Sequence, residues 1–157
     1  MSDLNPGDLA PNFNLPTDGD GQIELSELKG KTVILYFYPK DATPGCTTEA
    51  IDFSQAKSRF DNANAVVIGV SKDSVQKHDK FKAKNELQVI LASDEDGTVI
   101  ESYGSWILKK LYGREYMGID RSTFLIDKNG VLNQIWRKVR VKGHVDAVLE
   151  AVQQIAG

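Results

Sequence analysis

The chain has 157 residues, of which 41% are hydrophobic, enough for one soluble globular domain with a substantial core. A formal charge of -3 argues against nucleic acid or acidic lipid as the main partner, and no apolar run is long enough to span a membrane. The start of the sequence lacks the basic and apolar regions of a signal peptide, and the single cysteine excludes an internal disulfide, so the cytoplasm is the expected compartment.

The first third of the chain predicts a hairpin, a buried strand and a helix. Residues 10–25 (APNFNLPTDGDGQIEL) form two short extended pieces around an Asp-Gly turn, which is typical of a hairpin. Ser26 is expected to cap a short helix that ends at Gly30. Residues 31–38 (KTVILYFY) are rich in β-branched and aromatic side chains, as in a central strand covered on both faces. Residues 44–61 have the apolar spacing of a helix.

Strands and helices continue to alternate in the rest of the chain. We expect strands at 65–71 and 88–93, helices at 73–86 and 98–104, a hairpin of 122–127 with 131–139, and a final helix at 144–156. This order predicts an α/β protein of thioredoxin-like fold, with an N-terminal β-hairpin extension and a central mixed sheet flanked by helices. We expect a single domain over residues 1–157.

The only cysteine lies where the strand 31–38 gives way to the next helix. Pro39 ends the strand, Thr43 is a favourable N-cap, and Pro44 is favoured at the first helical position. Gly45 and Cys46 are then the second and third helical residues, so the sulfur is expected beside the Thr43 hydroxyl and unpaired backbone N–H groups. Such surroundings favour thiolate over thiol, and Gly45 leaves the approach open to a small substrate.

Several other kinds of chemistry lack the residues they need. A dithiol motif requires a second cysteine, and an acyl-transfer enzyme requires a histidine beside the sulfur. The two histidines, His78 and His144, are expected to be solvated or capping residues. No cluster with metal-ligand spacing and no glycine-rich phosphate motif is present, so no metal or cofactor is predicted. An inert buried cysteine stays as the simplest alternative.

Residues 36–50 (YFYPKDATPGCTTEA) contain the pattern Pro-x-x-x-Thr-x-x-Cys, and residues 118–127 read GIDRSTFLID. Together they resemble the peroxiredoxins, and in particular their bacterioferritin comigratory protein, or Q-type, subfamily. The resemblance implies thiol-dependent reduction of hydrogen peroxide and alkyl hydroperoxides through a sulfenic acid on Cys46.

The same resemblance implies roles for the residues around the sulfur. Thr43 and Arg121 would hold the thiolate and the peroxide oxygens, and Pro39 would shield the site from water. The backbone of Gly45 would assist in binding the substrate, and Glu49 would orient the arginine.

The sequence departs from the subfamily in having no second cysteine. Subfamily members place a resolving cysteine at the position of Ile51 or on the helix around Lys82. The sulfenic acid would therefore be reduced by an external thiol such as thioredoxin, glutaredoxin or glutathione, and the protein is expected to act as a monomer. The alternative is a one-cysteine redox sensor or thiol-binding module without efficient turnover.

Overall fold

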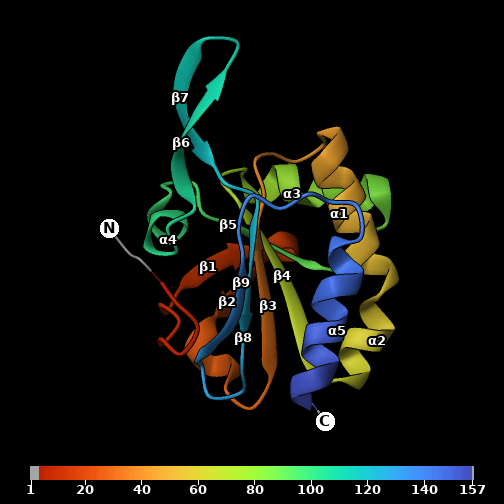
Figure 1. Ribbon diagram of the computed structural model, residues 1–157. Coiled ribbons are helices and arrows are strands. Elements are labelled where there is room, and N and C mark those ends of the chain that lie inside the picture. Colours follow the sequence, from red (N-terminus) through yellow and green to blue (C-terminus); the bar gives the residue numbers. More distant parts are fainter. Residues whose placement is uncertain (1–3, 157) are drawn as a thin grey trace.

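A mixed β-sheet forms the centre of the molecule (Figure 1), whose computed structural model describes residues 4–156. Within these residues the sheet has seven strands in the order β2-β1-β5-β4-β3-β8-β9. The parallel strands are β3 (Thr32–Phe37), β4 (Ala65–Ser71) and β5 (Ile90–Ser93). The antiparallel strands are β1 (Asn14–Thr17) and β2 (Gly21–Glu24) at one edge, and β8 (Ser122–Ile126) and β9 (Leu132–Trp136) at the other.

The longer helices cover one face of this sheet (Figure 1). They are α1 (Pro44–Gln55), α2 (Lys57–Asn62), α3 (Val75–Asn85) and α5 (His144–Ala156). The other face is covered by α4 (Thr98–Ser102) and the N-terminal segment, which includes the 3-10 turn Leu25–Leu28. The 3-10 turn Asp18–Asp20 lies beside α3 instead, where the Gly19 N–H donates to Asp79. No helix in residues 4–156 is long and apolar enough to cross a membrane.

Strand β3 is buried on both sides, as its composition predicts. Ile34 and Tyr36 pack in the cluster beneath α1, α2 and α5, whereas Val33, Leu35 and Phe37 pack on the opposite face. Side chains alternate between the two faces of a strand, so one strand contributes to both halves of the core. The mixed sheet, the N-terminal hairpin and the flanking helices confirm the predicted architecture.

Two details of the predicted helices are wrong. Ser26 does not cap a helix, because the 3-10 turn begins one residue earlier, at Leu25, and has no side-chain cap. The single helix expected over 44–61 is divided at Ala56, whose N–H is shared between the carbonyls of Asp52 and Phe53. The apolar spacing continues through this break, so periodicity alone could not reveal it.

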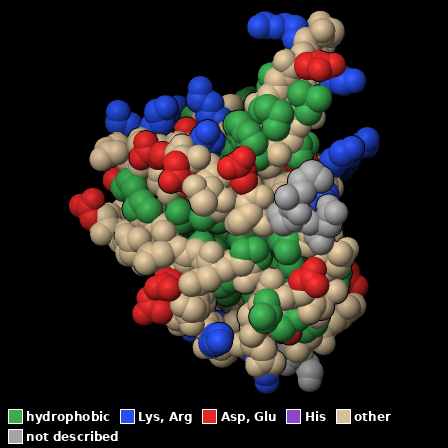
Figure 2. Space-filling model, turned by 90° about the vertical axis from the view of Figure 1, so that its left-hand side faces the viewer, with side chains coloured by type: hydrophobic (Ala, Val, Ile, Leu, Met, Phe, Trp, Pro, Cys, Tyr) green, Lys and Arg blue, Asp and Glu red, His purple; other side chains and the backbone are tan. Residues whose placement is uncertain are grey.

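A second hairpin, unassigned by sequence reasoning, projects beyond the sheet (Figure 1). It consists of β6 (Trp106–Leu111) and β7 (Arg114–Ile119), joined by Tyr112 and Gly113. Both turn residues have positive φ, as a two-residue turn of type I′ requires. Tyrosine is a rare choice there, which is why the turn was not recognised. Figure 2 shows hydrophobic side chains along this hairpin and charged ones at its tip.

Both histidines are buried, contrary to the prediction that they are solvated or capping residues. His78 has no exposed surface, and His144 is 6% exposed. His78 lies three residues before the buried Phe81 and so shares the inner face of α3. His144 starts α5 and forms a hydrogen bond with the Thr123 hydroxyl through Nε2.

The burial of His144 predicts a loss of stability in mild acid. Burial, with a smaller contribution from the Arg121 charge, lowers the pKa of His144 from 6.5 to about 4. Between these values the unfolded chain binds a proton that the folded protein does not, so stability falls as pH drops below 6.5. We expect His144→Gln to remove up to about 3 kcal/mol of this pH dependence. Urea denaturation across this window measures it, and parallel curves for both proteins would contradict the prediction.

Candidate active site

Cys46 lies in the first turn of α1, directly beyond the carboxyl end of β3. Pro44 is the first residue of the helix, so the N–H groups of Gly45 and Cys46 have no acceptor within it. Cys46 is 2% exposed and shares the buried face of α1 with Glu49 and Phe53, three and seven residues further on. The sulfur is therefore turned toward the sheet at the positive end of a helix.

Arg121 reaches the sulfur because of the pairing between β3 and β8. Phe37, the last residue of β3, lies opposite Ser122, the first residue of β8. Arg121 precedes Ser122 and therefore lies just past the carboxyl end of β3, the end from which the chain continues into α1. Two segments far apart in the sequence are brought together by antiparallel register alone.

The guanidinium of Arg121 joins a carboxylate and the sulfur. Nη1 donates a hydrogen bond to Glu49 Oε1 at 2.7 Å, and Nη2 donates to Cys46 Sγ at 3.3 Å. The Glu49 side chain is fully buried, whereas that of Arg121 is 18% exposed. The planar fork of donors fixes the cation relative to both partners.

Burial disfavours the charged form of the Glu49 carboxyl, and Arg121 offsets this effect only in part. Burial raises the pKa of Glu49 to about 7, although the charge and hydrogen bond of Arg121 act in the opposite direction. Its second oxygen, Oε2, has no hydrogen-bond partner within the described residues. The charge of Glu49, and with it the strength of its contact with Arg121, is therefore sensitive to pH near neutrality.

Gly45 makes room for the arginine. A Cβ atom built on Gly45 would lie 3.2 Å from Nη2 of Arg121, closer than most Cβ contacts. The structure thus shows that the missing side chain accommodates the guanidinium, whereas an approach for substrate at Gly45 stays a prediction.

Thr43 and Pro39 occupy the loop between β3 and α1. Thr43 is the N-cap residue, as predicted, but its side chain makes no capping hydrogen bond; Oγ1 donates instead to the Lys40 carbonyl at 2.8 Å. Pro39 is exposed. Within the described residues neither side chain has a hydrogen bond to the sulfur, so their proposed actions on thiolate, peroxide and water stay predictions.

Lys109 is a charged neighbour that sequence reasoning missed. It lies on β6, where its pKa is lowered, mainly by burial; the Asp120 charge opposes this effect and the Arg121 charge adds to it. The charge of its ammonium group therefore interacts with that of the Arg121 guanidinium. Sequence reasoning could have found Lys109 only by first predicting the hairpin of β6 and β7 that carries it.

Residues 6–135 match the family model described as AhpC/TSA family. The chain is 50% identical over 150 residues to Peroxiredoxin Bcp of Bacillus subtilis (strain 168), an alignment that covers 96% of each protein. It is also similar to the solved structure of the Xanthomonas campestris Bacterioferritin Comigratory Protein, with a TM-score of 0.88, 43% identity and 92% of each chain covered. A serine-for-cysteine variant of Xylella fastidiosa PrxQ gives a TM-score of 0.94 at 37% identity over 100% of each chain.

The chain therefore belongs to the AhpC/TSA family, whose members similar to it are peroxiredoxins, a class of thiol-dependent peroxidases. The predicted likeness to the Q-type subfamily and the thioredoxin-like fold are both confirmed. The Xanthomonas campestris Peroxiredoxin Q has been solved with either of two different cysteines replaced by serine. That relative has at least two cysteines, whereas this chain has one.

Substitution of Gly45 by alanine separates fold stability from reactivity of the site. Alanine is favoured over glycine by about 1 kcal/mol in a helix interior, and this preference offsets the crowding of Arg121, so the variant should still fold. Its Cβ, however, would crowd Nη2 of Arg121 and weaken the hydrogen bond from this nitrogen to the sulfur. We expect alkylation of Cys46 by iodoacetamide at neutral pH to slow several-fold in Gly45→Ala. Thr48→Ala, one turn further along the exposed face of α1, is the control; equal alkylation rates in all three proteins would contradict this account.

Proposed function

We propose that Cys46 is the peroxide-reactive residue of a one-cysteine peroxidase. The observation that carries this proposal is the single guanidinium of Arg121, which donates to both the Cys46 sulfur and the buried Glu49 carboxylate. An inert buried cysteine would not need a cation held 3.3 Å from its sulfur by a fully buried counter-charge. Fixed donors also suit the negative charge that develops when an O–O bond breaks.

In the proposed reaction the thiolate sulfur attacks one oxygen of the peroxide. The S–O bond forms as the O–O bond breaks, and two electrons pass from sulfur to the leaving oxygen. That oxygen departs as hydroxide or alkoxide and takes up a proton to become water or alcohol. Cys46 is left as a sulfenic acid. The proposed substrates are hydrogen peroxide and alkyl hydroperoxides; an alkyl peroxide reduction activity is named for the similar Xanthomonas campestris protein.

The neighbouring residues would act on this step without changing covalently. Arg121 would bind the peroxide oxygens as well as the sulfur, and Glu49 would keep its guanidinium oriented. The N–H groups of Gly45 and Cys46 point from the start of α1 and would bind the leaving oxygen. Thr43 would contact the peroxide, and Pro39 would restrict water at the loop.

An external thiol would return the sulfenic acid to thiol. The residues at the two positions where the subfamily carries a second cysteine are Ile51, half-buried on α1, and Lys82, whose ammonium pairs with Asp18 at 2.8 Å. Neither can form a disulfide. Thioredoxin, glutaredoxin and glutathione are the candidate reductants, in a protein that we propose to be cytoplasmic and monomeric.

Mass spectrometry after one equivalent of peroxide tests the proposal. With dimedone present, we expect an adduct on Cys46, and none in Cys46→Ser. Peroxide consumption should then continue in the presence of excess dithiothreitol. An unmodified thiol would overturn the assignment of Cys46. A dimedone adduct without repeated turnover would instead identify a redox sensor.

The pH dependence of Cys46 oxidation tests the part played by Glu49. Because the pKa of Glu49 is about 7, the carboxylate is charged above this pH and loses its ion pair with Arg121 below it. We expect Glu49→Gln to oxidise about tenfold more slowly above neutrality, with a smaller difference in acid. Rates of sulfenic acid formation across pH measure this. Glu150→Gln, on the exposed face of α5, is the control, and a constant ratio between Glu49→Gln and the natural chain would refute the mechanism.

A further inference from the structure

A groove runs between α3 and the loop that leads into α1. Its volume is about 370 Å³, within the range of small-ligand sites. Lys77, Lys80, Phe81 and Lys84 line one side, and the loop residues Lys40 and Ala42 line the other. The four helix residues follow the spacing of three, four and seven positions that puts side chains on one helical face. Phe81 and the lysine stems provide apolar walls, with ammonium groups around them.

The ammonium groups of the groove are unpaired. Within residues 4–156 no carboxylate forms an ion pair with Lys40, Lys77, Lys80 or Lys84. By contrast, Lys82 of the same helix extends elsewhere and pairs with Asp18 at 2.8 Å. The four lysines, whose positive charges repel one another, therefore line a single groove in a protein whose overall charge is -3. An anion bound there would relieve that repulsion.

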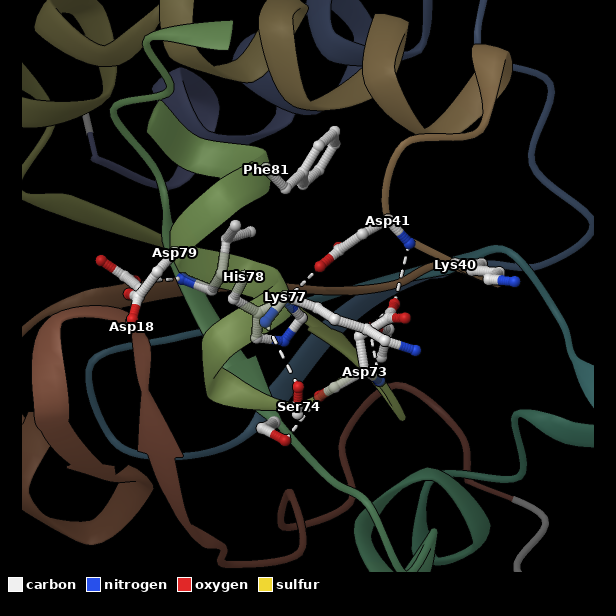
Figure 3. A network of polar contacts seen from close by, with 12 residues as sticks. Asp18, Lys40, Asp41, Asp73, Ser74, Lys77, His78, Asp79 and Phe81 are labelled. Carbon is white, nitrogen blue, oxygen red and sulfur yellow. Dashed lines mark hydrogen bonds and ion pairs between the residues drawn. The ribbon is translucent and has the colours of Figure 1, made fainter. Parts of the chain in front are cut away.

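Two aspartates also line the groove, but their carboxylates already have partners inside the protein. Asp41 accepts hydrogen bonds from the Tyr38 hydroxyl and from His78 Nδ1. Asp73 accepts from the backbone N–H of Asp41 at 2.8 Å and from the Ser71 hydroxyl at 2.7 Å. Figure 3 shows the Asp41 carboxylate turned toward His78, while the ends of Lys40 and Lys77 extend away from it.

His78 neutralises the inner carboxylate. Its Nε2 faces the Ala92 carbonyl at 2.9 Å, which can only accept, and its Nδ1 faces Asp41 Oδ2 at 2.7 Å. With Asp41 as a carboxylate, which also accepts from the Tyr38 hydroxyl, both ring nitrogens donate, and His78 is the cationic partner of Asp41. Burial alone would lower the pKa of His78, but the hydrogen bond and charge of Asp41 raise it overall, in agreement with this geometry. The charge presented by the groove is thus positive.

We infer that this groove binds the reductant of Cys46, and that this reductant is a small acidic peptide thiol of the glutathione type, with at least two carboxylates. The inference rests on the proposed peroxidase function. Ala42 lies four residues before Cys46, so their Cα atoms are at most about 14 Å apart, and an extended tripeptide spans about 10 Å. Carboxylates held by the lysines would leave the thiol of such a peptide within reach of the start of α1.

The chemistry requires two molecules of the thiol for each peroxide. The first attacks the sulfenic sulfur, forms a mixed disulfide with Cys46, and releases the sulfenic oxygen as water. The second attacks the sulfur of the bound peptide, so that the Cys46 thiolate leaves and the peptide disulfide departs. The oxidant is the peroxide already consumed, and no further co-reactant is needed.

The test compares an acidic thiol with a neutral one on pre-oxidised protein. Formation of the Cys46 mixed disulfide is followed by intact-mass spectrometry with glutathione and with 2-mercaptoethanol. In the triple variant Lys77→Gln, Lys80→Gln, Lys84→Gln we expect the glutathione reaction to slow about tenfold, because each exposed charge contributes a fraction of a kcal/mol. The reaction with 2-mercaptoethanol should change far less. Added salt should slow only the glutathione reaction.

A second triple variant with the same loss of charge provides the control. Lys29→Gln, Lys31→Gln, Lys128→Gln alters the opposite end of β3, where the backbones of Gly30 and Lys128 are hydrogen-bonded. It should leave the glutathione rate unchanged. Equal slowing in both triple variants, or equal effects on both thiols, would overturn the groove assignment.

Binding of S-methylglutathione to the reduced protein tests the groove independently of the proposed peroxidase function. This probe has no free thiol, so its calorimetric titration needs no peroxidase activity. Binding that weakens with the groove variant would support the site even if Cys46 failed to oxidise. Oxidation of Cys46 by peroxide without such binding would leave the peroxidase intact and refute the groove.

Discussion

The contact of one guanidinium with a sulfur and a buried carboxylate holds the candidate site together. Arg121 bridges the start of β8 and the first two turns of α1, so the site exists only when sheet and helix are correctly docked. Removal of the Arg121 charge would leave the Glu49 carboxylate fully buried without its partner, a situation that costs about 3–5 kcal/mol. The same interaction therefore affects both the reactivity of Cys46 and the placement of α1. Substitution of Arg121 would change both properties at once.

The parts of the site that could be predicted from the sequence are the local ones. The strand end, the N-cap, the proline and the cysteine all lie within residues 37–46, and their structural signals act through neighbouring backbone groups. Arg121 is 75 residues from Cys46, and its position just before an apolar strand does not by itself set it apart from other basic residues. Its assignment came from the family resemblance; the register of β3 against β8 supplies the physical reason afterwards.

The features that were missed depend on distant partners or on uncommon backbone geometry. His78 is surrounded in sequence by polar residues, and its burial is compensated by Asp41, 37 positions away. The projecting hairpin turns through Tyr112, which has a left-handed conformation that tyrosine rarely adopts. Its turn therefore lacks the Asn-Gly dipeptide by which such turns are recognised. The groove likewise joins the loop before α1 to the face of α3, two segments whose lysines look like ordinary solvated charges when each is read alone.

The interruption at Ala56 limits how far local unfolding can spread. Helical hydrogen bonds are cooperative within a continuous segment, and here the segment that starts at the sulfur ends at Gln55. Beyond it, α2 keeps Phe60 in the core through its own packing. The helix that carries the sulfur and the helix that follows it are therefore two separate hydrogen-bonded segments. The local stability around Cys46 therefore depends on the twelve residues of α1 rather than on the whole domain.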